Sequence, residues 1–350
     1  MKKPIVLIVV LAFLVTTALA GCAQSQPPAN STQSDQGSSS SDVVKKKIGV
    51  AMYDLTNPFY VDMMTAGNDA AADYNVDVIW KSSEGSLDKE ITLVENFIEQ
   101  KVDCILIDPI DAQGIVPVIN KAGEAGIPVV TMGNFVDTPY NVCTLYNDYN
   151  DTKRIAEIIG NLIDKTGKVG LIFGSSGNFC SDERQRGFAD GLGEFPDITL
   201  VQAPSNFDAA TGLKSAQDML AANPDIKAMH VVSDGVTLSV MQATKGTDIV
   251  LTSYDGNKEA SAFVKTGEIT LDLLTGAKRV GYWNVKVGAQ LANGEKLDQK
   301  QYLSSYFVMN DDLKAKVESW GLADGIKIVN PDDAIRLFDD YRSDLGPNAQ

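Results

Sequence analysis

Short apolar segments of strand length alternate with helix-forming segments along most of this chain. The first unit sets the pattern: residues 48–53 predict a buried strand, and Asn57 then precedes Pro58, as an N-cap precedes a proline in the first turn of a helix. Strands and helices continue to alternate to about residue 148, and the pattern then restarts. This double alternation predicts an α/β fold with doubly wound parallel sheets.

The turn of the first unit brings an amide and two aromatic rings to the carboxyl end of a strand, where open α/β sheets bind ligands. The residues are Asn57, Phe59 and Tyr60. An amide satisfies hydroxyl groups and aromatic rings cover the apolar faces of a sugar ring, so the turn suits a hydroxylated ligand. An ordinary strand-to-helix turn with a good N-cap explains the same residues equally well.

Length and charge narrow the class of protein. The chain has 350 residues, enough for two domains, and 30 Lys and Arg against 46 Asp and Glu give a formal net charge of −16. Such an acidic chain disfavours a nucleic-acid partner.

The N-terminal segment predicts where in the cell the protein is located. Lys2 and Lys3 precede the apolar residues 5–18, and Leu19-Ala20-Gly21-Cys22 follows, which resembles the lipobox of bacterial lipoproteins. We therefore expect a signal peptide over residues 1–21, a lipid on Cys22, and a flexible tether over residues 22–44 that holds the protein outside the cytoplasm on the cell membrane. The alternative is a chance cysteine after an ordinary signal peptide.

Few residues suggest reactive chemistry. Cys104, Cys143 and Cys180 are expected to be buried free thiols, and the single histidine, His230, is expected to be structural. Neither a phosphate-binding loop nor a nucleophile elbow is present. We therefore expect no metal, no cofactor and no catalysis.

Carboxylates at predicted strand ends could be mistaken for an acid–base pair. They are Asp108, Asp148, Asp234 and Asp255. Capping of helices and acceptance of hydrogen bonds from ligand hydroxyls are the preferred interpretations over paired catalytic carboxylates.

Four motifs carry a family resemblance. Asn57-Pro-Phe-Tyr60, the strand that begins Ile127-Pro-Val, the helix segment Glu183–Phe188 and the turn Tyr254-Asp-Gly256 occur in order across about residues 46–308. Together they resemble the periplasmic sugar-binding proteins of the ribose-binding class. The resemblance implies two Rossmann-like lobes with the ligand enclosed between them.

The resemblance also implies how the chain is divided. Three hinge crossings are expected near residues 148, 276 and 309. The N-terminal lobe would comprise residues 45–148 and 276–308, and the C-terminal lobe residues 149–275 and 309–345, with the segment from 309 packing on the C-terminal lobe.

Residue by residue, the resemblance implies a ligand site shared by both lobes. Asn57, Phe59 and Tyr60 would line the first lobe's side, and Phe207 would cover the other ring face. Arg184 would donate to ligand oxygens, and Asp255 would accept from ligand hydroxyls. Replacing either of these two charged residues by alanine is expected to abolish most binding and leave the fold near wild-type stability. Further candidates are Tyr53, Asp108, Gly133, Asp148 and Phe179.

Three positions depart from the ribose and hexose binders. Gly133-Asn134 stands where those proteins carry Asp-Arg, Ser233-Asp234 where they carry Asn-Asp, and Thr275 where they carry Gln or Asn. Asn134, Ser233, Asp234 and Thr275 remain candidate ligand contacts. Unpaired buried polar groups are costly, so the departures argue against ribose or glucose bound in the familiar way. A smaller or less hydroxylated polyol, a modified sugar or a related polar metabolite is the preferred hypothesis.

The expected function is that of a monomeric binding protein that delivers a sugar or polyol to an ABC permease after hinge closure. A ligand sensor that presents its closed form to a chemoreceptor or sensor kinase fits the sequence as well. A lipid-anchored hydrolase is disfavoured because the chain lacks a nucleophile with a partner base. A transcriptional repressor is disfavoured because a signal peptide replaces the DNA-binding head.

Overall fold

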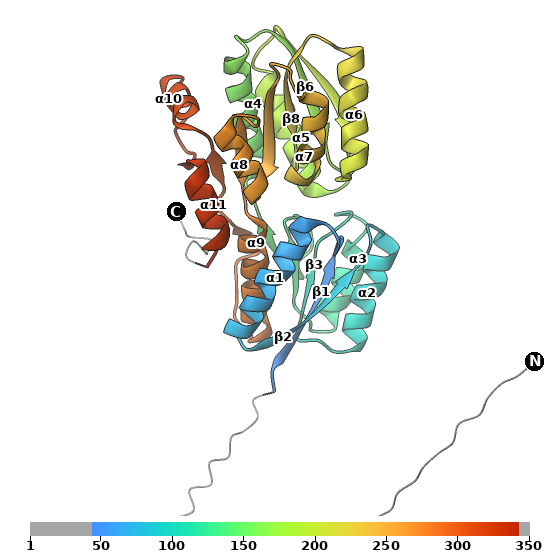
Figure 1. Cartoon of the computed structure of the whole chain (residues 1–350). Coiled ribbons are helices and arrows are strands. Elements are labelled where there is room, and N and C mark those ends of the chain that lie inside the picture. Colours follow the sequence, from blue (N-terminus) through green and yellow to red (C-terminus); the bar gives the residue numbers. More distant parts are fainter. Residues whose placement is uncertain (1–43, 343–350) are drawn as a thin grey trace, which may run out of the picture. The chain divides into compact units, whose positions relative to one another are not determined.

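The computed structural model describes residues 44–342, which fold into two α/β lobes (Figure 1). The expected signal peptide over 1–21, Cys22, the tether up to residue 43, and residues 343–345 of the expected C-terminal lobe lie outside the described residues. Within residues 44–342, no helix combines the length and apolarity that a membrane span needs.

The first lobe is built on a parallel sheet with the strand order β11-β5-β4-β3-β1-β2. In chain order its strands are β1 (Lys46–Met52), β2 (Val76–Ser82), β3 (Cys104–Ile107), β4 (Val129–Met132), β5 (Asn141–Leu145) and β11 (Lys300–Tyr302). β1 is flanked on both sides, with Ile48 in register with Val78 of β2 and Cys104 of β3. This position explains why the β1 sequence is a nearly continuous apolar run.

Helices cover both faces of the first sheet. They are α1 (Pro58–Asp73), α2 (Leu87–Glu99), α3 (Val116–Glu124) and α9 (Ala277–Ala292). The pair α1 and α9 packs in one hydrophobic cluster, which includes Met63 and the fully buried Trp283, and the pair α2 and α3 packs in another, which includes Phe97 and Ile119. The lobe is therefore doubly wound, as the alternation in the sequence predicts.

The second lobe repeats this plan with the strand order β13-β12-β10-β9-β8-β6-β7. Its strands are β6 (Gly167–Phe173), β7 (Ile198–Pro204), β8 (Ile226–Val231), β9 (Val250–Asp255), β10 (Leu271–Leu274), β12 (Tyr306–Val308) and β13 (Ile328–Val329). All neighbouring pairs are parallel except β10 and β12, which are antiparallel.

The helices of the second lobe again lie in two layers. α4 (Asp148–Leu162), α5 (Phe179–Leu192) and α10 (Asp311–Ser319) contribute to one hydrophobic cluster, and α6 (Ala209–Ala222), α7 (Asp234–Thr244), α8 (Lys258–Thr266) and α11 (Pro331–Asp339) to the other. Both lobes are thus Rossmann-like, and the predicted fold class is confirmed.

The chain crosses between the lobes three times: after β5, after β10, and between β11 and β12. The third crossing falls at residues 303–305, and the expectation of a crossing near 309 is wrong. The residues just before 309 belong to the second lobe because β12 pairs with β10 of the second sheet. Phe307 and Val308 enter the two opposite hydrophobic clusters of the second lobe, which explains why this short segment belongs there.

The segment after residue 309 was expected to pack on the second lobe. α10 and β13 do so, but Tyr341 lies in the hydrophobic cluster of the first lobe, beside Tyr282 of α9. The C-terminal part of the described chain therefore contacts both lobes.

Candidate ligand-binding site

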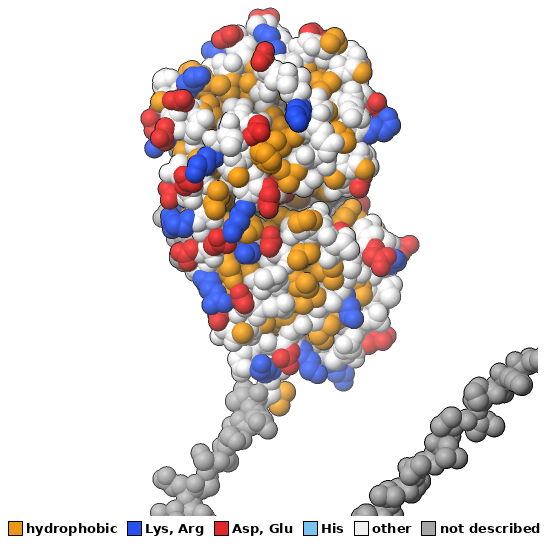
Figure 2. Space-filling view, in the orientation of Figure 1, with side chains coloured by type: hydrophobic (Ala, Val, Ile, Leu, Met, Phe, Trp, Pro, Cys, Tyr) orange, Lys and Arg blue, Asp and Glu red, His pale blue; other side chains and the backbone are white. Residues whose placement is uncertain are grey.

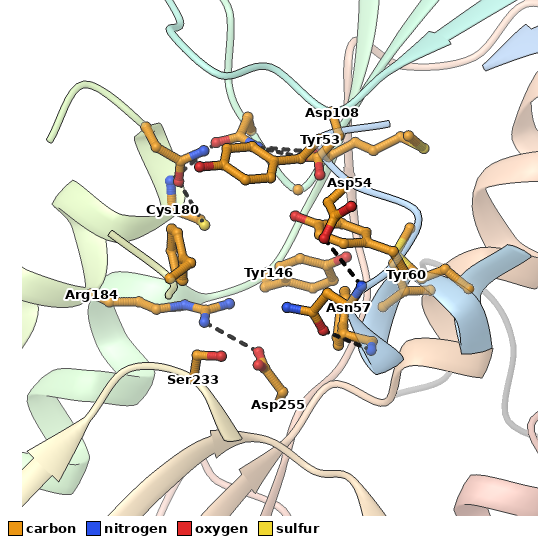
Figure 3. Close-up of a pocket in the computed structure, with 18 residues that line it drawn as sticks. Tyr53, Asp54, Asn57, Tyr60, Asp108, Tyr146, Cys180, Arg184, Ser233 and Asp255 are labelled. Atoms are coloured by element: carbon orange, nitrogen blue, oxygen red, sulfur yellow. Dashed lines mark hydrogen bonds and ion pairs between the residues drawn. The ribbon is translucent and has the colours of Figure 1, made fainter. Parts of the chain in front are cut away.

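A cavity of about 130 Å³ lies between the two lobes, at the carboxyl ends of the parallel strands (Figure 3). Side chains of both lobes line it. The first lobe contributes Tyr53, Asp54, Asn57, Phe59, Tyr60, Met63, Asp108, Met132, Gly133, Asn134, Tyr146 and Val280, and the second lobe contributes Asn178, Cys180, Arg184, Phe207, Ser233 and Asp255.

Helix caps position several of these residues. The Asn57 side chain accepts a hydrogen bond from the backbone N–H of Phe59 at the start of α1, where Pro58 is the first helical residue. Asn178 caps α5 in the same way by accepting from the N–H of Ser181. The side chain of Asp54 accepts from the N–H groups of Leu55, Thr56 and Asn57, so the turn before α1 is held by its own residues. These hydrogen bonds keep the pKa of Asp54 low, against the effect of its partial burial.

Arg184 is the charged centre of the second lobe's wall. Its guanidinium projects from α5 toward the cavity (Figure 3), and the residue is 4% exposed. Nε donates to Asp148 Oδ1 at 2.8 Å, and Nη1 donates to the carbonyl of Val232 at 2.7 Å and to Asp255 Oδ1 at 3.3 Å. The guanidinium carbon lies 3.6 Å from the centre of the Tyr254 ring. These contacts leave Nη2 available to a ligand.

The charged side chains of this group shift one another's pKa values. Burial opposes the charged form of Arg184, but the Asp148 carboxylate keeps the pKa of Arg184 well above its usual value. Burial raises the pKa of Asp148 and of Asp255, and Arg184 partly offsets this effect. One buried cation thus faces two buried carboxylates.

The first lobe presents a second polar group. Asn134 Nδ2 donates to Asp108 Oδ1 at 3.2 Å and to the carbonyl of Met132 at 3.0 Å. The hydroxyl of Tyr60 also interacts with Asp108. Burial raises the pKa of Asp108 to about 7, and the hydrogen bond from Tyr60 limits that rise.

Aromatic rings form much of the remaining wall. The rings of Tyr53 and Tyr60 stack with their centres 6.2 Å apart, and Phe59 meets Tyr60 edge-on at 5.5 Å. On the second lobe, Phe207 lies over Gly174, where an added Cβ would come within 2.3 Å of the Phe207 ring. Planar apolar surfaces from both lobes therefore face the cavity, as a sugar ring requires.

The lobes touch each other at the edge of this cavity, partly through residues that line it. Asn178 Nδ2 donates to the carbonyl of Pro109 at 3.1 Å, and the N–H of Cys180 donates to Asn134 Oδ1 at 3.2 Å. The N–H of Ala112 approaches the carbonyl of Gly177 at 3.4 Å. These contacts join loops of different lobes, so the structure is a closed arrangement of the cleft.

The structure places most of the predicted ligand residues around the cavity. Among the described residues, eleven of them line it: Tyr53, Asn57, Phe59, Tyr60, Asp108, Gly133, Asn134, Arg184, Phe207, Ser233 and Asp255. Gly133 has no side chain and contributes only its backbone there. The Tyr146 ring fills the adjoining space and lies 3.2 Å from where a Cβ would stand.

Four predicted residues do not line this cavity. Asp148 lies behind Arg184 and also accepts from the Tyr254 hydroxyl at 2.9 Å, so it positions the arginine. Thr275 is 1% exposed and donates to the backbone carbonyl of Asp255 at 3.4 Å. Thr275 directly follows β10 as expected, whereas Asp148 begins α4, and both side chains point into the protein.

The other two serve local structure. Asp234 is 1% exposed and accepts hydrogen bonds from the Ser253 hydroxyl and, at 2.7 Å, from the N–H of Asn257, so it holds the turn after β9. Phe179 packs against Phe135 of the first lobe, with ring centres 5.9 Å apart. Its ring contributes to lobe contact instead of the cavity.

Seven lining residues escaped prediction: Asp54, Met63, Met132, Tyr146, Asn178, Cys180 and Val280. Tyr146 and Asn178 follow strands, so the strand-end rule could have found them. Met63 and Val280 lie on helices with the spacing of core residues, and no sequence signal separates them from the core. Cys104 and Cys143 are buried as expected, whereas Cys180 is partly exposed.

His230 is fully buried, as the expectation of a structural histidine implies. Nδ1 lies 2.9 Å from Thr252 Oγ1, and the ring stacks on Phe188 with centres 4.8 Å apart. Burial lowers the pKa of His230 to about 3, so the ring is neutral in the folded protein.

The fold and the interlobe cavity define the class of this protein. The family model described as periplasmic binding protein domain matches residues 48–296, and the chain belongs to this family. The resemblance found in the sequence motifs is thereby confirmed.

Similar proteins include binders of several polyhydroxy compounds. The ribose import binding protein RbsB of Bacillus subtilis (strain 168) is 26% identical over 304 residues, which cover 85% of this chain and 96% of the relative. A solute-binding protein of an ABC transporter from Actinobacillus succinogenes 130z, solved with bound D-allose, has a TM-score of 0.71 at 23% identity, covering 77% of this chain and 100% of the other.

A third similar protein has a different kind of ligand. The ABC transporter solute-binding protein of Bacillus halodurans C-125, solved with bound myo-inositol, has a TM-score of 0.72 at 24% identity. The match covers 78% of this chain and 97% of the other chain. These relatives are named as binding proteins of transporters, in agreement with the expectation that the chain is not an enzyme.

Proposed function

We propose that this protein captures a sugar or sugar-like polyol between its two lobes and delivers it to an ABC importer. The observation that supports this most is the pairing of Arg184 and Asp255 on one wall with Asn57 and the aromatic residues on the other. A ligand that contacts both walls favours the closed arrangement, which a permease can then recognise.

The chemistry of the walls fits hydroxyl groups. Arg184 Nη2 donates, the Asp255 carboxylate accepts, and Asn57 and Ser233 can do both. Phe59 and Phe207 supply apolar surface for the ring. The cavity volume of about 130 Å³ suits a small molecule of monosaccharide size or below.

The ligand is expected to differ from those bound in the familiar ribose or glucose mode. Gly133 contributes no side chain where the ribose and hexose binders carry a carboxylate, and Thr275 is turned away from the cavity. Fewer hydroxyl groups can therefore be paired than in those proteins, and unpaired ones are costly.

A ligand panel tests the function. Thermal unfolding is measured with D-ribose, D-glucose, D-allose, xylitol, myo-inositol and glycerol, and calorimetry follows for each compound that raises Tm. At least one compound should bind with a dissociation constant in the micromolar range or below. Binding should be lost in Asp255→Ala. Strong stabilisation by D-ribose alone would contradict the proposed ligand class, and the absence of stabilisation by any compound would contradict the function.

We also propose that the protein is a lipoprotein attached through Cys22 to the outer face of the cell membrane. The lipobox-like segment Leu19–Cys22 supports this. In the native host, the wild-type protein should fractionate with membranes after a high-salt wash, and Cys22→Ser should be released. The same fractionation for both proteins would contradict the anchor.

A further inference from the structure

The cavity carries an excess of acidic groups. Asp54, Asp108 and Asp255 line it together with a single basic residue, Arg184, and that arginine is already paired with Asp148 and Asp255. No cation lies among the partners of Asp108 in the described residues; its neighbours are Asn134 and the Tyr60 hydroxyl. Asp108 is thus a carboxylate with hydrogen bonds but without a counter-charge.

The titratable groups around Asp108 are uncharged at neutral pH, because burial raises the pKa of Glu90 to about 9 and the pKa of Tyr60, Tyr146 and Cys180 above their usual values. The titratable groups that face it are Tyr60 of α1, Glu90 of α2, Tyr146 after β5, and Cys180 of α5. Glu90 is fully buried, with Oε2 near the N–H of Ile110 and Oε1 without a hydrogen-bond partner in the described residues. None of these groups supplies a positive charge.

The outer part of the cleft is acidic as well. A second hollow of about 590 Å³ shares Asp54, Asn57, Phe59, Phe207 and Asp255 with the first. It is also lined by Asp62, Asp208, Asp234 and Glu259, and among its described lining residues there is no Lys or Arg. The space-filling view shows acidic side chains on both sides of the groove between the lobes, with basic side chains among them at its left end (Figure 2).

Two lysines offset part of this acidic charge. Lys258 and Lys278 lower the pKa of Asp62 against the effect of its burial, and they share the single carboxylate of Asp339 of α11. Like charges inside a partly closed cleft with apolar walls reinforce one another, so the field along the path to the cavity disfavours an anion.

From this arrangement, and resting on the proposed function, we propose that the cavity selects a polyhydroxy ligand without negative charge. We further propose that Asp108 binds this ligand from the first lobe, by accepting hydrogen bonds from a hydroxyl or ammonium group. Asn134 positions the Asp108 carboxylate, and because Asn134 Oδ1 accepts from the N–H of Cys180 on the other lobe, closure of the cleft and the orientation of Asp108 are linked.

Matched compounds test the charge selection. Calorimetry compares D-glucose with D-glucosamine, D-glucuronate and D-glucose 6-phosphate, and the same comparison is made for D-ribose and myo-inositol with their phosphates. In each series the acid or phosphate should bind at least tenfold more weakly than the neutral or amino compound. For a compound that binds, Asp108→Asn should reduce affinity at least tenfold. Tighter binding of an anion, or unchanged affinity in Asp108→Asn, would overturn the proposal.

A ligand-free measurement keeps the proposal testable if none of these compounds binds. Such a failure would contradict the proposed function. Whether the Asp108 carboxylate lacks a counter-charge is tested separately, by thermal unfolding of the ligand-free protein. Since its pKa in the folded protein lies near 7, above the value of 3.8 for a free side chain, ionisation of Asp108 lowers stability as pH rises between these values. Asp108→Asn should therefore gain Tm relative to wild type from pH 4 to pH 8.

Asp103 provides the matched control at the other end of the same strand. It is paired with Lys46 at 2.8 Å, and these contacts lower its pKa despite partial burial. Asp103→Asn should lose Tm relative to wild type over the range in which Asp108→Asn gains. A lower Tm for Asp108→Asn than for wild type at pH 8 would overturn the claim that its carboxylate lacks a counter-charge.

A separate observation concerns the C-terminal segment 331–342, which is attached to both lobes. On the second lobe, α11 packs against α8, and Asp332 pairs with Lys265 at 2.6 Å. On the first lobe, Tyr341 packs on Tyr282 and donates to Asp69 of α1, while Arg342 lies 3.4 Å from Asp73. Asp339 lies between Lys258 of α8 and Lys278 of α9, at 2.6 and 3.9 Å.

We infer that segment 331–342 is a strap that holds the lobes in the closed arrangement. Any rotation that separates α8 from α1 and α9 must break one of its two sets of contacts, because the strap makes both sets at once. Closure is therefore favoured before a ligand binds, and the strap sets how far the cleft opens.

Distances between the lobes test the strap without a ligand. Spin labels are attached at Lys81→Cys on the first lobe and Lys214→Cys on the second, in a Cys180→Ser background because Cys180 is a partly exposed free thiol. Their separation is measured by double electron–electron resonance. Combining Tyr341→Ala with Arg342→Ala should shift the distribution toward a second, different distance. Asp225→Ala, which removes a surface pair with Lys168 in the second lobe and outside the strap, should leave it unchanged. Identical distributions in the wild type and the double variant would overturn the inference.

Discussion

Arg184 Nε lies 2.8 Å from Asp148 Oδ1, and this pair joins the cavity to the hinge. Asp148 is the first residue of α4, directly after the first crossing between the lobes, and Arg184 belongs to α5. The Arg184 side chain is 5% exposed and the Asp148 side chain is 2% exposed. A ligand that contacts Arg184 therefore acts on a group fixed to the point where the chain changes lobe.

Arg184→Ala should destabilise the protein as well as abolish binding. It leaves Asp148 and Asp255 buried without their shared cation, a loss of about 3–5 kcal/mol. The structure thus revises the expectation from sequence that the fold would stay near wild-type stability. Urea unfolding measures the effect. The control is Arg186→Ala, whose side chain is 55% exposed and should change stability by less than about 1 kcal/mol. Equal stability of the two variants would contradict the buried pairing.

Asp255→Asn should weaken ligand binding with a smaller effect on folding. The amide keeps the shape of the side chain but removes the charge that strengthens hydrogen bonds from ligand hydroxyls, a loss of about 2 kcal/mol or roughly 30-fold in affinity. Calorimetry with the best ligand of the panel checks this. Asp225→Asn, at a surface pair with Lys168, should bind like wild type. Unchanged affinity in Asp255→Asn would remove Asp255 from the site.

Gly133→Ala should cost more stability than its backbone conformation alone explains. Gly133 has φ of +69°, which costs an L-residue about 1–2 kcal/mol, and the added Cβ would also meet the Tyr146 ring at 3.2 Å. Gly294→Ala is the matched control, with φ of +83° and no atom within 4 Å of the added Cβ. Equal losses in the two variants, measured by urea unfolding, would show that Tyr146 does not fill the space beside Gly133.

His230 should make the protein sensitive to acid. Its pKa is about 3 in the folded protein against 6.5 for a free side chain, so the unfolded chain binds the proton more readily between these values. The contribution of neutral His230 to the free energy of unfolding is fully present above pH 6.5 and is lost as pH falls toward 3. At pH 4 the loss is roughly 3 kcal/mol. His230→Asn, which keeps a polar group near Thr252, should lack this dependence. Parallel pH profiles of Tm for the two proteins would contradict a neutral buried His230.

Much of the fold was accessible from sequence because local signals agree with it. The Asn57-Pro58 cap starts α1 where the pattern predicts, and the apolar run of β1 matches its place between two neighbouring strands. The third crossing was misplaced because Tyr306–Val308 reads as a continuation of the preceding strand. Only the antiparallel pairing with β10, a contact between residues far apart in the chain, assigns it to the other lobe.

The residues of the site could be predicted from the sequence to a similar extent. Strand ends identify residues near the cleft, but they do not tell which way a side chain points. Asp108 and Asp234 both follow strands, yet one lines the cavity and the other is bonded to Ser253 and Asn257. Met63 and Val280 enter the cavity from helix faces that are otherwise part of the core. These distinctions depend on packing between lobes, which no local pattern encodes.

A crystal structure of the protein with the tightest-binding compound of the panel decides whether the ligand is captured between the lobes. We expect density for the compound between Phe59 and Phe207, with oxygens within hydrogen-bond distance of Arg184 Nη2, Asp255 and Asp108. The lobes should be closed around it. Density for the compound only outside the space between the lobes, or a compound there that touches none of these three residues, would show that the proposed site is wrong.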